Sequence, residues 1–187
     1  MRDLIVTEFI TLDGVMEAPG GEPTHPHTGW VEPFFDDEVA RYKWEETRDA
    51  DDLLIGRVTY ESFAGAWPTY EGEFADKMNS MPKHVVSSTL RDPGWANTTV
   101  LPGDLVADVT ALKQGDGEPI LVAGSCRLVQ ALLQHGLVDE LHLQLFPVII
   151  GGGLRCFSDD RAKLEFTLAE SRATPSGVVL QTYRRTT

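Results

Sequence analysis

The sequence predicts an α/β protein built around one mixed β-sheet. Short apolar segments alternate with amphipathic helical segments, and glycine or hydroxyl residues follow several of the apolar segments. Such alternation is typical of strand–helix–strand units, in which helices pack on a largely parallel sheet. Two strand-like segments, residues 164–174 and 178–183, end the chain around a Pro-Ser-Gly turn and predict a terminal antiparallel hairpin.

The first third of the chain combines one strand, one long loop and one helix. Residues 4–10 form an apolar run that predicts the first strand, and residues 11–33 form a loop rich in glycine and proline. Loops of that length in a compact domain are usually functional or disordered. A helix is expected next, with either Asp36 or Asp37 as its N-cap.

The middle of the chain continues the alternation. A short buried strand at residues 53–55 leads into a helix that begins at Gly56, and a later helix is expected over residues 104–113. Further strands are predicted at residues 84–86 and 120–123. The middle of the chain therefore has the order expected of a parallel sheet.

The strongest pattern lies in residues 120–153. A buried strand ends at Gly124 and Ser125, an amphipathic helix follows to Gly136, and a second apolar strand runs to Pro147. A turn of this kind directs free backbone N–H groups and the positive end of the helix dipole beyond the strand. The turn at the first of these strand ends therefore suits a phosphate group.

Length and composition limit the class of protein. No linker or repeat divides the 187 residues, so one domain spanning residues 1–187 is expected. A formal net charge of −13 argues against nucleic acid and anionic lipid as partners. Cys126 and Cys156 form no recognisable framework, and no apolar run approaches the roughly 20 residues of a membrane span. We expect a soluble, cytoplasmic protein.

Three strand ends carry the residues that a dinucleotide needs. Each combines small or hydroxyl side chains, and two add an arginine suited to bidentate contact with phosphate. Taken singly, each is also explained by an ordinary turn or N-cap. Together, and in this order, they favour nucleotide binding by Gly56, Arg57 and Thr59; by Ser87, Ser88 and Thr89; and by Gly124, Ser125 and Arg127.

Several motifs carry a family resemblance that extends over nearly the whole chain. They are the Thr-Leu-Asp-Gly sequence at residues 11–14, the segment 54–61, the Ser-Ser pair at 87–88 and the block 124–157. With these motifs the chain resembles the dihydrofolate reductase superfamily, most closely the branch related to the reductase domain of the bacterial riboflavin-pathway deaminase-reductase. The resemblance implies a three-layer fold, in which helices flank a twisted, mixed, mostly parallel sheet of about eight strands.

The same resemblance implies an NADPH-dependent reductase and three groups of cofactor contacts. Contacts to the pyrophosphate and adenosine side would come from Gly56, Arg57 and Thr59. Contacts to the 2′-phosphate would come from Ser87, Ser88 and Thr89. The helix N-terminus beneath the phosphates would be formed by Gly124, Ser125, Arg127 and Leu128.

The catalytic and substrate residues are less clearly marked. The nicotinamide carries the hydride chemistry, so the protein supplies a proton donor and a pocket. The carboxylate with which dihydrofolate reductases hold the pterin is missing, because its position falls near Ala40. Asp13 is a candidate catalytic residue, although an Asp-Gly turn explains it equally well. Trp30, Phe34 and Glu38 are candidate substrate contacts.

We therefore expect a reductase that acts on a small heterocyclic or sugar-linked substrate. The nearest reaction implied by the resemblance is reduction of 5-amino-6-(5-phosphoribosylamino)uracil in riboflavin biosynthesis. A dihydrofolate reductase and a non-catalytic nucleotide-binding dimer are the alternatives. A homodimer is expected, formed through residues 138–153. No metal site is expected, because His25 and His27 have no third ligand nearby in the sequence.

Overall fold

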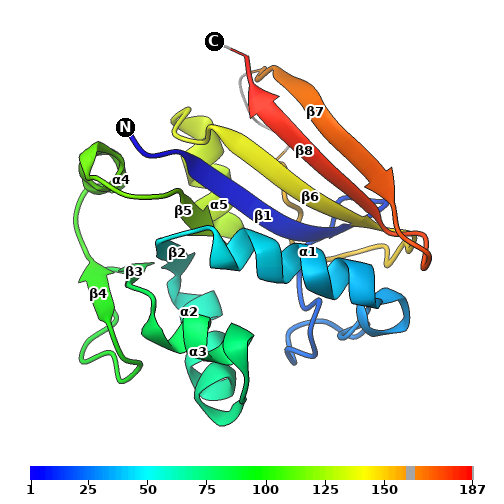
Figure 1. The fold of residues 1–187 in the computed structure, drawn as a ribbon, viewed down its shortest axis with the longest axis horizontal. Coiled ribbons are helices and arrows are strands. Elements are labelled where there is room, and N and C mark those ends of the chain that lie inside the picture. Colours follow the sequence, from blue (N-terminus) through cyan, green and yellow to red (C-terminus); the bar gives the residue numbers. More distant parts are fainter. Residues whose placement is uncertain (159–162, 187) are drawn as a thin grey trace.

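The computed structural model describes residues 1–158 and 163–186, and one sheet dominates it (Figure 1). Its eight strands follow the order β4-β3-β2-β5-β1-β6-β8-β7. All neighbouring pairs from β4 to β6 are parallel, whereas β8 is antiparallel to both β6 and β7. The strands are β1 (Leu4–Thr11), β2 (Asp52–Gly56), β3 (Lys83–Val86), β4 (Thr98–Leu101), β5 (Ile120–Val122), β6 (Glu140–Phe146), β7 (Phe166–Ala173) and β8 (Val179–Arg185).

Helices cover both faces of the sheet, which gives three layers. Side chains of α4 and α5 join one buried cluster, and those of α1, α2 and α3 join two clusters on the opposite face. The predicted fold class is confirmed, including the terminal hairpin. The helices are α1 (Asp37–Arg48), α2 (Arg57–Ala66), α3 (Glu73–Ser80), α4 (Leu105–Gln114) and α5 (Cys126–Gln134), with short 3₁₀ turns η1 (Glu32–Phe34) and η2 (Trp67–Thr69).

Local signals explain where the helices begin. Asp36 rather than Asp37 is the N-cap of α1, since its Oδ1 accepts hydrogen bonds from the backbone N–H groups of Glu38 and Val39 at 3.0 and 2.9 Å. Asp104 caps α4 in the same way. These carboxylates satisfy backbone donors that a helix leaves unpaired at its first turn.

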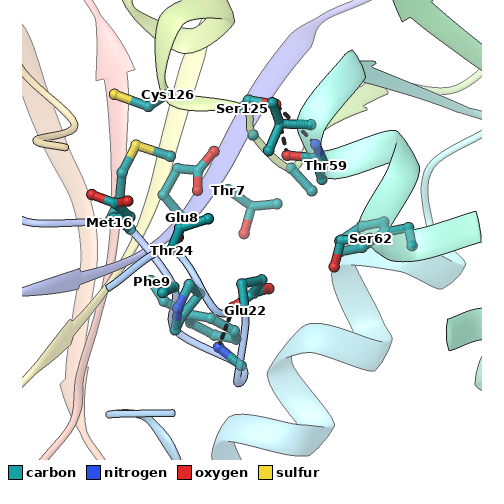
Figure 2. A pocket seen from close by; sticks show the side chains of 18 of the residues that line it. Thr7, Glu8, Phe9, Met16, Glu22, Thr24, Thr59, Ser62, Ser125 and Cys126 are labelled. Carbon is teal, nitrogen blue, oxygen red and sulfur yellow. Dashed lines mark hydrogen bonds between the residues drawn. The ribbon is translucent and has the colours of Figure 1, made fainter. Parts of the chain in front are cut away.

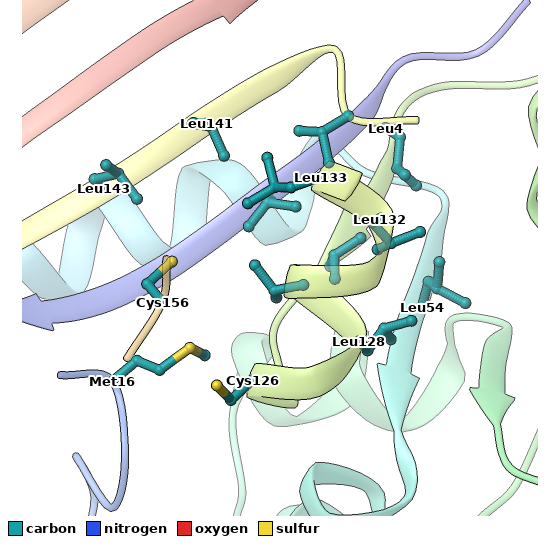
Figure 3. Close-up of a cluster of buried hydrophobic side chains, with 14 of the residues drawn as sticks. Leu4, Met16, Leu54, Cys126, Leu128, Leu132, Leu133, Leu141, Leu143 and Cys156 are labelled. Atoms are coloured by element: carbon teal, nitrogen blue, oxygen red, sulfur yellow. The ribbon is translucent and has the colours of Figure 1, made fainter. Parts of the chain in front are cut away.

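The amphipathic helix α5 provides the largest part of the core. Figure 3 shows its apolar side chains packed beside residues of β1 and β6, with Leu128 and Leu132 among them. The helix starts directly after β5, so this packing fixes the position of the turn between them. The core thereby holds the predicted phosphate-binding turn at the end of a central strand.

Two elements, α3 and β4, were not predicted from the sequence. Only Ala75 and Met78 of α3 are buried, so its apolar stripe is too short to give a clear helical period. None of the residues of β4 is fully buried, and the strand is defined by its pairing with β3 at the edge of the sheet. Tertiary contacts, rather than a local pattern, determine both elements.

The sheet opens on one side of its central strand. β1 pairs with β5 only from Leu4 to Val6, but with β6 from Ile5 to Thr11. Beyond Val6 the chain of β5 turns away at Ala123, which leaves one edge of β1 without a neighbouring strand. Ligands of open α/β sheets bind in crevices at such carboxyl ends of strands.

No helix within residues 1–158 and 163–186 combines the length and the apolar character needed to cross a membrane.

Candidate functional site

A cavity of about 390 Å³ lies at this opening of the sheet. Figure 2 shows residues from β1, the first loop, α2 and the start of α5 gathered around it. Most of the lining is apolar, and its polar groups include carboxylates, hydroxyls and one lysine, Lys43. A concave, mainly apolar site with a few convergent polar groups is the usual form of a small-molecule site.

The predicted turns meet at the rim of this cavity. β3, β2 and β5 are neighbours in the sheet, so the three strand ends lie next to one another at a single edge. The Ser125 hydroxyl lies 2.9 Å from Thr59 Oγ1 and accepts the backbone N–H of Thr59 at 3.1 Å. The Gly56 N–H donates to the carbonyl of Gly124 at 3.3 Å. Four of the predicted cofactor residues are therefore in direct contact.

Gly56 and Gly124 must both be glycine, because neither position has room for a side chain. A Cβ on Gly56 would lie 2.7 Å from Ser125 Oγ, and a Cβ on Gly124 would lie 2.7 Å from Thr59 Oγ1. Gly124 also has φ +82°, which is a conformation that L side chains rarely adopt, and its peptide bond to Ser125 is cis. The absence of side chains lets two strand ends approach closely.

The second group of predicted contacts lies beside this junction, with Ser88 and Thr89 exposed and Ser87 buried. Arg57 Nη1 donates to Thr89 Oγ1 at 3.2 Å, and the Arg57 guanidinium also lies 3.6 Å from the carboxylate of Glu61. Ser87 Oγ accepts the backbone N–H of Thr89 at 3.2 Å, and Ser88 is exposed. These residues do not line the cavity, but they extend its rim with hydroxyls and one cation.

The two remaining predicted cofactor residues, Arg127 and Leu128, lie in the first turn of α5 and differ in their exposure to solvent. Arg127 is exposed, whereas Leu128 is only 6% exposed and belongs to the hydrophobic core. Neither side chain lines the cavity. Ser125 does not cap α5 with its side chain, because its hydroxyl faces α2 instead. Backbone groups, more than these two side chains, define this part of the site.

Asp13 lies outside the cavity lining and anchors a turn. Its carboxylate accepts a hydrogen bond from Thr11 Oγ1 at 2.6 Å and from the Gly151 N–H at 2.9 Å. These bonds, with that from Thr11 as the largest contribution, lower the pKa of Asp13 below its usual value. The structure thus gives Asp13 the role of joining the first loop to the glycine-rich segment after β6.

None of the predicted substrate residues lines the cavity itself. Trp30 is buried, with its Nε1 donating to the carbonyl of Glu17 at 2.8 Å, and Phe34 is partly buried. Both rings pack edge-on against Phe146, at centroid distances of 5.4 and 6.4 Å. Glu38 pairs with an arginine of β7 at 2.9 Å. The neighbouring Phe35, which is 44% exposed, is the aromatic residue of this segment that lines the cavity.

Residues of the first loop line one side of the cavity. Backbone N–H groups of Gly29 and Val31 donate to the carbonyls of Ala18 and Pro19, which closes the loop on itself. Residues 20–24 lie beside Val58 of α2, where they line a second hollow. The predicted functional loop therefore forms one wall of the site.

The residue that sequence reasoning missed is Glu8, in the middle of β1. It lines the cavity although it is only 8% exposed. Burial raises its pKa to about 8, and this rise is partly offset by the positive charge of Lys43 and a hydrogen bond from the backbone of Gly124. A signal was present, because a carboxylate inside an apolar run that predicts a central strand must be buried.

A second set of buried charges lies beside Glu8. Lys43 donates to Thr7 Oγ1 at 2.7 Å and pairs with Glu46 at 2.9 Å, and His142 Nδ1 lies 2.8 Å from the other oxygen of Glu46. Burial alone would raise the pKa of Glu46, but Lys43 and His142 together hold it below its usual value. The lysine charge at the cavity is thus already neutralised.

Within residues 1–158 and 163–186, no three His, Cys, Asp or Glu side chains gather in a way that could hold a metal ion. His25 Nε2 instead lies 2.9 Å from the carbonyl of Gly152.

Comparison with known proteins places this chain in a defined family. The sequence model of the RibD C-terminal domain matches residues 2–180, so the chain belongs to that family. Protein YyaP of Bacillus subtilis, which is described as uncharacterized, is 27% identical over 97% of this chain and 94% of its own length. The similarity to YyaP therefore indicates no particular activity for this chain.

The fold is shared with solved structures, of which two are compared with this chain. A pyrimidine reductase-like protein from Corynebacterium diphtheriae superposes with a TM-score of 0.73 and 16% identity, over all of this chain and 92% of its own. Dihydrofolate reductase from Enterococcus faecalis, in a complex with NADP(H), gives a TM-score of 0.64 and 14% identity, over 99% of this chain and 97% of its own. The fold is therefore that of the dihydrofolate reductases, as expected.

Proposed function

We propose that the protein is an oxidoreductase, an NADPH-dependent reductase that transfers hydride to a small heterocyclic or sugar-linked substrate. The observation that carries the proposal is the glycine junction of Gly56 and Gly124 at the rim of an apolar cleft. At this junction the N-termini of α2 and α5 lie next to each other, and neither has a side-chain hydrogen bond that caps it. Helix N-termini are suited to phosphate groups. Membership of the RibD C-terminal domain family supports a reductase.

The residues at the rim fit the two ends of a dinucleotide phosphate. The starts of α2 and α5 would hold the pyrophosphate, with Thr59 and Ser125 fixed by their mutual hydrogen bond. The sequence predicts Arg57 at the pyrophosphate and adenosine side, but its hydrogen bond to Thr89 at 3.2 Å favours a place beside the 2′-phosphate. Arg57 and Thr89 together would bind this phosphate, which distinguishes NADPH from NADH. The bound cofactor would supply the hydride, and the first loop would exclude water from the cleft.

The cofactor assignment is tested by thermal denaturation with NADPH and with NADH. A ligand at about 100 times its Kd should stabilise the protein by about 2.7 kcal/mol. We expect a larger shift with NADPH, and we expect Arg57→Ala to reduce that preference. Arg48→Ala, which removes an exposed arginine that pairs with its neighbour Asp49, is the matched control. The absence of a shift with either nucleotide at millimolar concentration would refute the cofactor assignment.

The substrate proposal is reduction of 5-amino-6-(5-phosphoribosylamino)uracil, which is tested by following NADPH oxidation with this compound. Cofactor binding without turnover of a broad panel of carbonyl and imine compounds would favour the non-catalytic alternative. Tight methotrexate binding would instead favour a dihydrofolate reductase. The description of the Corynebacterium protein as pyrimidine reductase-like supports the uracil compound as the substrate.

We also propose a homodimer, formed through the end of the predicted segment 138–153 and the adjoining Leu154 rather than through its strand. β6 lies between β1 and β8, so its backbone cannot pair with a second copy. Exposed apolar side chains follow it, with Ile149 69% and Leu154 49% exposed, and these could bury each other in a dimer. Light scattering at two protein concentrations tests the proposal, and a strictly monomeric mass would refute it.

A further inference from the structure

Glu8 is a buried acid that forms no ion pair within the part of the chain that the structure describes. Its side chain is more than nine-tenths buried and contributes to the cavity lining (Figure 2). In the part of the chain that the structure describes, Glu8 forms no ion pair, and its Oε1 has no hydrogen-bond partner. A buried carboxyl oxygen without a partner is costly, so its retention inside a ligand site indicates a partner supplied by the ligand.

The charged and titratable groups around Glu8 favour its neutral form. From α1, Lys43 lowers and Glu46 raises its pKa, but these two residues pair with each other at 2.9 Å. From the first loop, the carboxylate of Glu17 adds negative charge to the cavity wall, while it accepts the N–H of Leu154 at 2.9 Å. From α5, the thiol of Cys126 donates to a backbone carbonyl at 3.0 Å. Burial is the largest of these influences, and Glu8 is therefore a carboxylic acid at neutral pH.

We propose that Glu8 is the proton donor of the reductase and that it selects substrates in which a neutral C=N bond is reduced. The inference rests on the proposed function. A neutral Glu8 supplies no counter-charge to a cation placed beside it, and the carboxylates of Glu17 and Glu22 in the cavity wall already accept backbone N–H groups. It does offer an O–H donor to a nitrogen atom. An acid that titrates near neutral pH is well matched to proton transfer in that range.

The reaction step balances as follows. In the uracil compound the C=N bond belongs to the open-chain form, in which the C1′–O4′ bond of the ribose has broken and the proton of the attached nitrogen has moved to O4′. The carbon of this bond would receive a hydride, which is one hydrogen with two electrons, from the nicotinamide, which would thereby be oxidised. The π electrons of that bond move to nitrogen, which forms a new N–H bond with the carboxyl proton of Glu8. The substrate becomes an amine, Glu8 becomes a carboxylate, and solvent returns its proton after product release.

The first arm of the test measures the protein alone. The carboxyl carbons of glutamate are labelled with ¹³C, and the Glu8 resonance is identified by its loss in Glu8→Gln and titrated by NMR. We expect its midpoint near pH 8, as burial requires. A midpoint near the ordinary glutamate value of about 4.5 would overturn the proposal, because no proton would then be available at neutral pH.

The second arm measures single-turnover oxidation of NADPH with 5-amino-6-(5-phosphoribosylamino)uracil between about pH 6 and pH 9. The wild-type rate should fall about tenfold per pH unit above the Glu8 midpoint. Glu8→Gln should lower the rate by about 10² to 10⁴ and remove this alkaline decline. Glu170→Gln, a matched change on the exposed edge strand β7, should keep the wild-type profile. An unchanged rate and profile in Glu8→Gln would overturn the proposal.

The two arms separate failure of the inference from failure of the proposed function. An enzyme that reduces the uracil compound while Glu8 titrates near pH 4.5 would retain the proposed function without Glu8 as its acid. A protein that oxidises no NADPH with this compound while Glu8 titrates near pH 8 would refute that substrate and still support a protonated Glu8.

Discussion

Replacing Glu8 by glutamine should change how the stability of the protein depends on pH. The pKa of Glu8 is about 8 in the folded protein, against an ordinary value of 4.5. Between these values the folded state holds a proton that the unfolded state has lost. The Glu8 contribution to stability is therefore fully present below pH 4.5, decreases as the pH rises, and is lost above pH 8. Glutamine stays neutral throughout and does not titrate.

The size of the effect follows from the same two values. One pKa unit corresponds to about 1.4 kcal/mol, so the wild-type protein should lose up to about 5 kcal/mol of unfolding free energy from this one group between pH 4.5 and pH 8. Near pH 5 the two proteins should have similar stability, because both side chains are neutral. At pH 9 the variant should be the more stable protein by several kcal/mol.

Urea denaturation followed by tryptophan fluorescence at each pH unit from 5 to 9 measures this difference. Other ionisable groups titrate alike in both proteins, so subtracting one curve from the other isolates Glu8. Glu170→Gln on the exposed edge strand is the control and should show a small difference that is constant with pH. A constant difference between wild type and Glu8→Gln would refute the argument that Glu8 is buried as a neutral acid.

Three further substitutions test the cleft and its supports. Gly124→Asp should abolish the NADPH-induced thermal shift, because its side chain would clash with Thr59 and place a negative charge at the helix start; an unchanged shift would contradict the phosphate assignment. Phe146→Ala removes a ring that is 0% exposed and should cost about 4 kcal/mol, which lowers Tm by about 8 to 16 °C; a fall of only a degree or two in calorimetry would refute this. Lys83→Met leaves three carbonyls at the end of α3 without their ammonium donor and should cost about 3 kcal/mol in urea denaturation. Faster amide exchange confined to α3 would accompany it, and a variant as stable as wild type would contradict it.

Local patterns in the sequence predicted most of the architecture, with α3 and β4 as the exceptions. The alternation of strands and helices, the capping aspartates such as Asp104 and the glycine turn at Gly124 are all encoded within a few residues of where they act. Their physical causes are short-ranged, since they depend on side-chain period, capping bonds and backbone freedom. The order of the elements and the three strand ends at one edge of the sheet could therefore be predicted.

The identity of the cleft residues depended on contacts between distant parts of the chain. The sequence marks Asp13 and Trp30 as candidates, but the structure commits the first to a turn and the second to packing against Phe146. Glu8 lines the cleft because β5 stops pairing with β1 after Val6, which opens the cleft beside the rest of β1. The burial of Glu8 and its raised pKa depend on residues that are distant in the sequence and pack around it in the fold. The residues next to Glu8 in the sequence do not determine either property. Local chemistry thus determined the scaffold and its glycine turns, whereas tertiary packing alone decided which acid lines the cleft.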